Sequence, residues 1–253
     1  MKTLIVTGAS SGIGREFAET LAADRRVEEV WVIARRADRL EELKTTIKKP
    51  VVAISLDLSD SDCIEKYKNM LVDRSPEVVA LVNAAGYGRF GEFENVTLSD
   101  QMGMIDLNAG ALTQITYLTL PYVVRSGQIY QVASVSALMP VPYISVYAAT
   151  KAYVLSFSRS LNVEMKHRGI RVMAVCPFWT RTEFFDRAAE QDDVVVHYAR
   201  FYTPKQVVER ALKDMRRKKD LSICGAYTRV MALGMKCLPH RLVMKIWCKQ
   251  QKK

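Results

Sequence analysis

The sequence lacks the features that mark several specialised classes of protein. No uninterrupted apolar run approaches about 18 residues, which argues against a transmembrane helix. The five cysteines are scattered, without the spacing of a metal site or redox pair, so we expect free thiols in a reducing compartment and no bound metal. Repeats and Gly/Ser-rich linkers are absent, which predicts a single domain over residues 1–253. An apolar run starts at Leu4 and leaves no room for a signal peptide, so we expect a cytoplasmic protein.

Positive charge is gathered at the C-terminal end of the chain. The formal net charge is +10, and residues 205–253 hold 14 Lys and Arg against 3 Asp and Glu, a net charge of +11. Residues 1–204 are nearly neutral, with 23 basic against 24 acidic side chains. Solvated helix faces in a C-terminal appendage would explain this pattern, and so would contact with an anionic membrane or partner.

Short apolar runs alternate with amphipathic stretches along most of the chain. This rhythm is typical of right-handed βαβ units, and near-continuous apolar strands indicate a parallel sheet with helices on both faces. We therefore predict an α/β fold with a doubly wound parallel sheet of about seven strands. The expected strands are residues 2–7, 30–34, 51–58, 78–82, 127–133, 170–175 and 221–224, and the expected helices include residues 37–47, 98–124, 145–167 and 204–217.

A glycine-rich turn separates the first expected strand from the first helix. Gly8, Gly12 and Gly14 allow a tight turn and the close approach of a pyrophosphate to a helix N-terminus, where free N–H groups favour anions. Ser10 and Ser11 add hydroxyl groups to the same turn. The position of the motif, between a strand and a helix, is the context that a dinucleotide-binding turn requires.

The second expected strand ends in Ala34-Arg35-Arg36 and lacks the acidic residue that would bond to an adenosine ribose 2′-hydroxyl. Guanidinium groups pair well with phosphate, so the two arginines favour NADP(H) over NAD(H). Two surface arginines that open a helix are the alternative, although this placement opposes the helix dipole. Asp57, at the end of the third strand, is a candidate acceptor for the adenine amino group.

Ser134, Tyr147 and Lys151 form a candidate catalytic set. Tyr147 and Lys151 are four residues apart, so on one helix they share a face and the ammonium lies beside the phenol. A phenol with a pKa near 10 is a poor proton carrier at neutral pH, and a neighbouring cation would lower that pKa. The pattern alone is common, and an exposed helical tyrosine and lysine would also produce it.

Together these motifs resemble those of the short-chain dehydrogenase/reductase family, in the right order and over nearly the whole chain. The resemblance implies a Rossmann fold and a nicotinamide-dependent oxidoreductase that acts on CH–OH groups. The matching residues are Thr7-Gly8-Ala9-Ser10-Ser11-Gly12-Ile13-Gly14, Leu56-Asp57-Leu58, Asn83-Ala84-Ala85-Gly86, Asn108, Ser134, Tyr147 and Lys151.

The resemblance also implies roles for individual residues. Tyr147 would be the general acid or base, Lys151 would lower its pKa and bind the nicotinamide ribose, and Ser134 would bind the substrate oxygen. Asn108 would kink a helix and support a proton relay to Lys151, and Thr182 would bind the nicotinamide amide. The expected cofactor contacts are Gly8, Ser10, Ser11, Gly12, Ile13, Gly14, Arg35, Arg36, Asp57, Leu58, Asn83, Ala84, Ala85, Gly86, Tyr147, Lys151, Pro177, Thr180 and Thr182.

Two further residues are placed by the same resemblance. Asn83 is expected to stabilise the central strand and to lie by the adenosine ribose. Ser136 is not assigned a catalytic role, because only Ser134 keeps the thirteen-residue offset from Tyr147.

The sequence departs from the family pattern at two places. Phe178 follows Pro177 where the family usually has glycine, which brings a bulky ring close to the nicotinamide or the substrate. The chain also continues past the last strand in a basic C-terminal helical extension over about 225–253. Its last helix carries Arg241, Lys245 and Lys249 at intervals of four, and apolar residues on another face. Such a helix can lie weakly on an anionic membrane, pack on its own domain or pack across a dimer.

The segment over about 178–202 is long for a connection inside a compact domain. Loops of this kind are often lids or binding loops, so we predict an apolar substrate cover, with local packing as the alternative. The segment contains Trp179, Phe184, Phe185, His197, Tyr198, Phe201 and Tyr202.

We therefore expect an NADP(H)-dependent oxidoreductase that interconverts a ketone and a secondary alcohol on a lipophilic small molecule, with a hydroxysteroid dehydrogenase as the specific version. A generic carbonyl or 3-oxoacyl reductase is the alternative within enzymes. A non-catalytic nucleotide-sensing scaffold is the alternative outside them. We expect a homo-oligomer, a dimer or tetramer formed through the two long helices, and no specific nucleic-acid partner.

Overall fold

The computed structural model describes residues 1–190, 194–195 and 197–251, and the strands in these residues form one sheet. The strands are β1 (Lys2–Thr7), β2 (Glu29–Ala34), β3 (Val51–Ser55), β4 (Glu77–Asn83), β5 (Val123–Val132), β6 (Arg171–Cys176) and β7 (Leu221–Ile223). Their order is β3-β2-β1-β4-β5-β6-β7, and every neighbouring pair is parallel. The order reverses between β1 and β4, which is where sheets of this type bind ligands, beyond the carboxyl ends of the strands.

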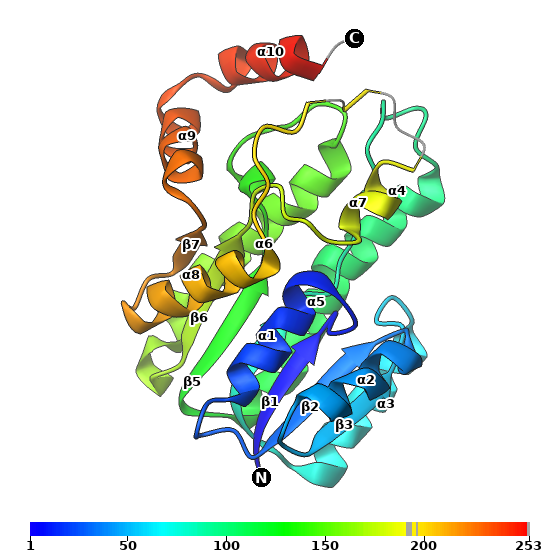
Figure 1. Cartoon of the computed structure of the whole chain (residues 1–253), viewed down its shortest axis with the longest axis vertical. Helices are drawn as coiled ribbons and strands as arrows, with labels where there is room; N and C mark the ends of the chain where they lie inside the picture. The colour runs from blue at the N-terminus through cyan, green and yellow to red at the C-terminus, as the bar shows by residue number, and fades with distance from the viewer. Residues whose placement is uncertain (191–193, 196, 252–253) are drawn as a thin grey trace.

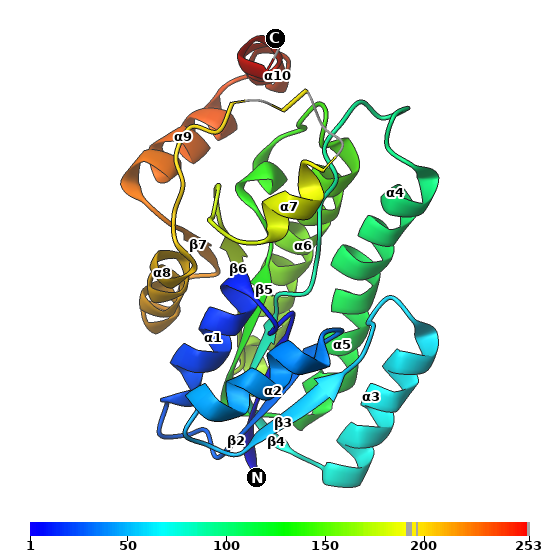
Figure 2. The same ribbon diagram turned by 45° about the vertical axis from the view of Figure 1, so that its right-hand side comes forward.

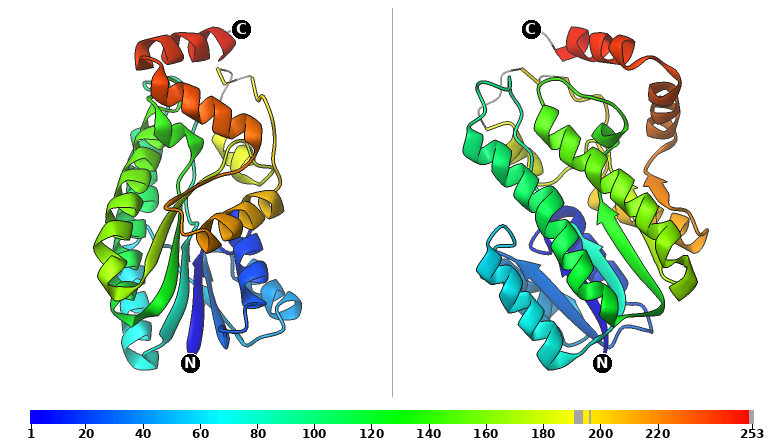
Figure 3. Two further views of the ribbon diagram at one scale, coloured as in Figure 1. Left: turned by 90° about the vertical axis from the view of Figure 1, so that its left-hand side faces the viewer. Right: turned by 180° about the vertical axis from the view of Figure 1, so that it is seen from behind.

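Helices cover both faces of the sheet, as Figures 1 and 3 show. One face is covered by α1 (Gly12–Ala22), α2 (Ala37–Thr46) and α8 (Pro204–Arg216). The other is covered by α3 (Ser61–Arg74), α5 (Leu112–Thr119) and α6 (Ser145–Glu164), and α4 (Leu98–Ile105) packs against α6. The predicted doubly wound α/β fold is confirmed.

The continuous burial of the central strands follows from this two-sided cover. In β1, Leu4 and Val6 pack into one helical layer and Ile5 packs into the other, and all three are fully buried. Ile5 lies level with Trp31 of β2 and Leu81 of β4, which are also fully buried. A strand that is buried on both faces has no polar side, which is why these strands are almost entirely apolar in sequence.

The helix expected over about 98–124 is interrupted and ends slightly earlier. A π-helical turn, η1 (Asp106–Ala111), separates α4 from α5, and a short 3-10 turn, η2 (Leu120–Tyr122), leads into β5. Pro121 in that turn has no N–H to continue the helical ladder. The strand β5 therefore starts at Val123 rather than at the predicted residue 127. Elsewhere in the sheet, β3 ends at Ser55 rather than at the predicted residue 58.

The C-terminal extension folds back over the carboxyl ends of the strands as α9 (Ala226–Cys237) and α10 (His240–Gln251), which Figure 2 shows above the sheet. Val243 and Gln251 of α10 are buried, and Trp247 Nε1 donates to the Pro142 carbonyl at 3.0 Å. Gln251 also exchanges hydrogen bonds with the backbone of His197, at 2.9 and 3.2 Å. Of the three expected placements, packing on its own domain is therefore the one that the structure shows; residues 252–253 lie outside the described part.

Among the helices in the described residues, none is both long and apolar enough to cross a bilayer.

Candidate active site

A cavity of about 730 Å³ lies beyond the carboxyl ends of the central strands. It is lined by the glycine turn and the two arginines, by the candidate catalytic residues Ser134, Tyr147 and Lys151, and by side chains of α9 and α10. Of all the residues predicted for catalysis or cofactor binding, only Asn83 and Asn108 do not line it. The fold thus brings residues that are more than 170 positions apart in the chain into one cavity.

The glycine turn forms one wall of this cavity, between the end of β1 and the start of α1. Gly8 has φ +66°, and a Cβ on it would lie 2.6 Å from Ala85 N, so only glycine fits there. The end of β1 is joined to the residues that follow β4, because Thr7 Oγ1 accepts hydrogen bonds from Ala84 N and Ala85 N, at 3.2 and 3.3 Å. The first turn of α1 lines the cavity, and its free N–H groups suit a pyrophosphate.

Both arginines after β2 lie at the cavity wall beside this turn. Arg36 Nη2 lies 2.7 Å from Glu183 Oε2 and donates to Ser10 Oγ at 3.2 Å. Arg35 Nη1 is 3.8 Å from Asp57 Oδ2. The two guanidinium side chains are 43% and 62% exposed, so a phosphate on a bound ligand can reach them. The glycine cradle, the helix N-terminus and these cations together fit a dinucleotide cofactor with its phosphate groups.

The Ser134 hydroxyl lies near enough to the Tyr147 phenol to lower the pKa of that phenol by hydrogen bonding. Ser134 follows β5, and Tyr147 lies in the first turn of α6, with Lys151 one turn further on. Lys151 Nζ lies 5.6 Å from the centroid of the Tyr147 ring and donates to the Val132 carbonyl at 2.9 Å. The shared helix face that the spacing predicts is therefore present.

Burial controls the pKa values of both groups on α6. Lys151 is 5% exposed, and its burial lowers its pKa to about 8. Burial also raises the pKa of Tyr147 to about 12, against the opposing effect of the hydrogen bond with Ser134. Desolvation is the largest influence on the phenol, and it acts in the direction opposite to the one expected of Lys151. The expectation that Lys151 lowers the pKa of Tyr147 stays a prediction. At neutral pH the phenol holds its proton and is ready to act as an acid.

The buried ammonium makes the stability of the fold depend on pH. Below pH 8 the folded protein carries a desolvated charge at Lys151, whereas above pH 8 the folded side chain loses its proton before the unfolded one does. We expect the free energy of unfolding of the wild type to rise relative to that of Lys151→Met by about 1–2 kcal/mol between pH 7.5 and 9.5. Urea denaturation of both proteins at several pH values measures this difference. A constant difference across that range would show that the ammonium is not desolvated.

Asn108 lies in the π-helical turn η1 and is fully buried. Its Oδ1 accepts from Tyr87 N at 3.0 Å, and its Nδ2 donates to Tyr87 O at 2.9 Å and to Thr150 Oγ1 at 3.1 Å. The amide therefore ties the segment after β4 to α6, next to Lys151. Its expected part in a proton relay stays a prediction.

Asn83 has a different place from the one expected. Its Nδ2 donates to Thr116 Oγ1 at 3.0 Å and to Gln131 Oε1 at 2.9 Å, which ties β4 to α5 and β5. The expected stabilisation of the central strand is confirmed. The side chain does not line the cavity, so the expected cofactor contact of Asn83 is not one that this geometry supports.

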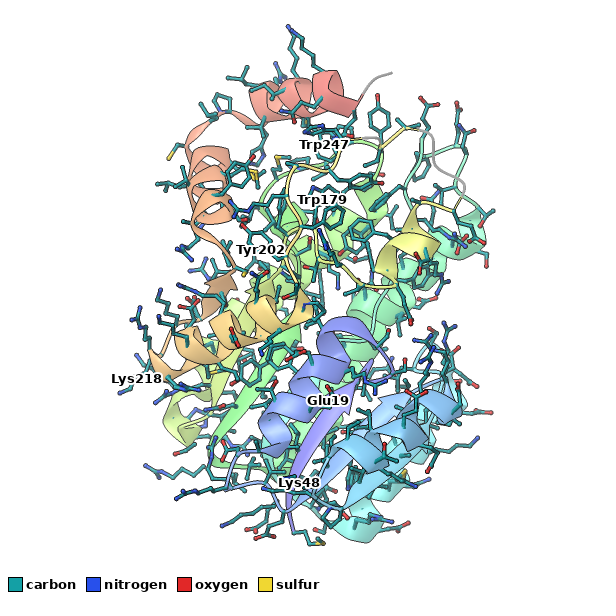
Figure 4. All side chains as sticks on the ribbon, viewed as in Figure 1. Glu19, Lys48, Trp179, Tyr202, Lys218 and Trp247 are labelled. Atoms are coloured by element: carbon teal, nitrogen blue, oxygen red, sulfur yellow. The ribbon has the colours of Figure 1, made fainter. Side chains whose placement is uncertain are left out.

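Aromatic side chains form the other end of the cavity, among them Trp179 and Trp247, which are labelled in Figure 4. Their rings stack at 6.4 Å between centroids, and Phe184 packs on Tyr147 at 5.4 Å. Phe178 packs against Trp179 at 5.5 Å and lines the cavity without closing it. Part of the expected cover, residues 191–193 and 196, lies outside the described residues.

Two contributors to the cavity were missed from the sequence. Glu183 lines it and pairs with Arg36, and Trp247 reaches it from α10. Both placements depend on long-range folding, and no local signal in the sequence indicates them.

Comparison with known proteins agrees with this geometry. Residues 2–193 match the family model described as short chain dehydrogenase. Very-long-chain 3-oxoacyl-CoA reductase-B of Danio rerio is 37% identical in an alignment 194 positions long, which covers 72% of this chain and 60% of that protein. The chain thus spans about three-fifths of the length of that reductase. Serine 3-dehydrogenase of Agrobacterium fabrum is 34% identical in an alignment 187 positions long, which covers 72% of this chain and 73% of that protein.

The solved structures include one in which a cofactor is bound. A short-chain dehydrogenase from Sphingobium yanoikuyae in complex with NADPH superposes with a TM-score of 0.79 at 31% identity. The superposition covers 97% of this chain and 96% of that protein.

Proposed function

The chain belongs to the short-chain dehydrogenase family, and from that premise we propose that it is an NADP(H)-dependent oxidoreductase that interconverts a ketone and a secondary alcohol on a lipophilic small molecule. The observation that carries this proposal is the continuity of the cavity. One cavity contains a dinucleotide cradle, a phenol near Ser134 that keeps its proton at neutral pH, and a wall of aromatic rings. The similar protein in complex with NADPH supports the choice of cofactor, together with Arg35 and Arg36.

The residues supply the acid and the oxygen-binding group that ketone reduction needs. When bound, NADPH supplies a hydride for the carbonyl carbon. Tyr147 donates its proton to the carbonyl oxygen, which completes the alcohol. In oxidation the phenolate oxygen of Tyr147 takes the proton back from the alcohol. Ser134 steadies the developing charge on that oxygen by hydrogen bonding. The ammonium of Lys151 lies on the same helix face and stabilises the phenolate that Tyr147 leaves behind.

The aromatic end of the cavity indicates an apolar substrate. Trp179, Phe184, Phe185 and Trp247 line it, with Met235 of α9. The name of the Danio rerio relative makes a long 3-oxoacyl thioester the first substrate to test. A hydroxysteroid, the substrate class expected from the sequence, is the second. The name of serine 3-dehydrogenase points instead to a small polar substrate. These three substrate classes differ in the apolar surface that they would bury.

A substrate series therefore tests the proposal. We expect kcat/KM to rise by about fourfold for each added CH2 group that the cavity buries, since burying one contributes about 0.8 kcal/mol. The measurement follows NADPH absorbance with 3-oxoacyl thioesters of increasing length, a ketosteroid, and serine with NADP⁺. Turnover of serine with no gain from chain length would contradict an apolar substrate. Turnover of none of these by a protein that binds NADPH would favour the non-catalytic scaffold.

Two exposed apolar surfaces supply evidence on partners. The first lies on α4, α5 and α6, where Leu98, Tyr117 and Val163 are 75%, 76% and 69% exposed. We assign this surface to a second copy of the chain, since exposed apolar groups on neighbouring helices are typical of subunit interfaces. The second lies on α9, where Val230 and Leu233 are 72% and 64% exposed.

The basic helix α10 also exposes apolar side chains of its own, since Leu242 and Ile246 are each 45% exposed. Arg241, Lys245 and Lys249 are exposed, because Val243 and Gln251 of the same helix are buried against the domain. Apolar side chains beside a row of cations suit an anionic membrane surface. Two copies of this basic surface would repel each other, so we assign it to weak membrane contact rather than to the subunit interface.

One sedimentation series tests both assignments. We expect the protein alone to sediment as a dimer or tetramer and Tyr117→Asp to sediment as a smaller species.

With vesicles that contain anionic lipid, we expect a fraction of the protein to pellet at low salt and to be released at high salt. The double variant Lys245→Ala, Lys249→Ala should lose this pelleting. A monomeric wild type, or pelleting that is equal with neutral vesicles, would contradict the respective assignment.

A further inference from the structure

The carboxylate of Glu183 lies at the end of the cavity that the glycine turn lines. Its Oε2 is 2.7 Å from Arg36 Nη2, and that nitrogen also donates to Ser10 Oγ at 3.2 Å. The nearby Ser11 hydroxyl also helps to lower the pKa of Glu183. The carboxylate therefore lies among a guanidinium and hydroxyl groups, which are the donors that a phosphate oxygen needs.

The segment that carries Glu183 covers the glycine turn. A Cβ placed on Gly12 would lie 2.9 Å from Thr182 Cγ2, so Thr182 packs directly on the turn. One residue after Glu183, Phe184 packs on the ring of Tyr147 at 5.4 Å. Three consecutive residues thus contact the glycine turn, Arg36 and the candidate acid.

The ion pair between Glu183 and Arg36 is exposed to solvent, so another anion can replace the carboxylate. The side chains of Glu183 and Arg36 are 48% and 43% exposed, and exposed pairs contribute little net stability. Arg36 lowers the pKa of Glu183, so the carboxylate stays charged at neutral pH. A phosphate that arrives at Arg36 meets this negative charge and must displace it.

We propose that Glu183 competes with the 2′-phosphate of NADP(H) for Arg36 and thereby reduces the preference for NADP(H) over NAD(H). The inference rests on the proposed function, because it takes Arg36 as the phosphate ligand. Binding of the 2′-phosphate breaks the Glu183–Arg36 pair, and the segment Thr182–Phe184 loses that tether. NADH has no 2′-phosphate and leaves the pair intact. Glu183 is therefore a specificity-determining residue that acts through Arg36.

Binding measurements on the full-length protein test the competition without relying on turnover. Isothermal titration gives the Kd values of NADPH, NADH, adenosine 2′,5′-bisphosphate and 5′-AMP. We expect Glu183→Gln to bind NADPH and the bisphosphate about three- to tenfold more tightly than the wild type, and NADH and 5′-AMP within about twofold. Asp186→Asn is the matched control, since it removes the same charge from an exposed position on the same segment, and we expect no change above twofold.

The background variant Arg36→Ala decides whether the effect runs through Arg36. In that background we expect Glu183→Gln to change no Kd by more than about twofold. A gain that persists there, or one that is equal for NADH and 5′-AMP, would overturn the competition. So would tighter binding of NADPH by the wild type than by Glu183→Gln. Equal Kd values of the wild type for NADPH and NADH, with no effect of Arg36→Ala, would instead overturn the proposed cofactor preference, and the competition with it.

Discussion

Replacing Tyr147 by phenylalanine is expected to lower kcat by about a thousandfold or more and to leave the Kd for NADPH within about twofold. The substitution removes only the hydroxyl, and with it the proton that completes the alcohol. The ring and its packing on Phe184 are kept, so the cavity should keep its shape. Steady-state turnover of a ketone and direct titration with NADPH measure the two quantities separately.

The same helix offers a matched control for this substitution. The hydroxyl of Tyr153 hydrogen-bonds to Thr113 at 2.9 Å, and Tyr153 does not line the cavity. We expect Tyr153→Phe to retain turnover within about twofold of the wild type. If Tyr147→Phe kept a tenth of the activity or more, another group would have to supply the proton and the assignment of Tyr147 would be wrong.

Replacing Arg36 by alanine is expected to weaken NADPH binding by about 10- to 100-fold and NADH binding by less than threefold. A hydrogen bond to a charged group contributes about 1.5–3 kcal/mol, and the 2′-phosphate would lose at least one. Arg36 donates to Ser10 of the glycine turn, whereas the guanidinium of Arg35 lies towards Asp57. We therefore expect Arg36→Ala to weaken NADPH binding more than Arg35→Ala does. Titration of each variant with both cofactors measures the effect.

Arg39→Ala is the control for the loss of a nearby positive charge. Arg39 follows on α2, pairs with Glu42 at 3.5 Å and does not line the cavity. We expect its effect on either cofactor to stay within twofold. Equal weakening of NADPH and NADH by Arg36→Ala would show that this arginine does not read the 2′-phosphate.

The parts of the fold that could be predicted from the sequence are those set by local patterns. The strand β1, the turn at Gly8 and the start of α1 follow from an apolar run, a residue that needs positive φ and a helix N-terminus. The capping box at Thr203 and Gln206 likewise sets the start of α8 at Pro204. Each of these elements depends on neighbours within a few residues, and such signals can be read without knowing the fold.

The contacts that could not be predicted join residues far apart in the chain. Arg36 and Glu183 are 147 positions apart, and nothing in either local sequence indicates the other. Trp247 donates to Pro142, 105 positions away, so the packing of α10 over the cavity depends on how the whole domain folds. The basic spacing on α10 was compatible with three placements, and its packing on its own domain becomes evident only from long-range contacts such as those that bury Val243 and Gln251.

The pKa values of Tyr147 and Lys151 are a further property that could not be predicted from the sequence. From the sequence, a lysine four residues after a tyrosine suggests that the cation lowers the pKa of the phenol. The structure shows that Lys151 is itself buried and donates to Val132, and that burial is the largest influence on both groups. The degree of desolvation is a property of the folded cavity, which no spacing of residues reveals.

Transfer of deuterium is the measurement that tests the central claim most directly. The protein would be incubated with a long-chain 3-oxoacyl thioester and NADPH that carries deuterium at the reactive carbon of its nicotinamide, and the product would be analysed by mass spectrometry. The account predicts a secondary alcohol with one deuterium on the former carbonyl carbon from the wild type, and almost none from Tyr147→Phe. An alcohol without deuterium, or equal product from both proteins, would contradict it.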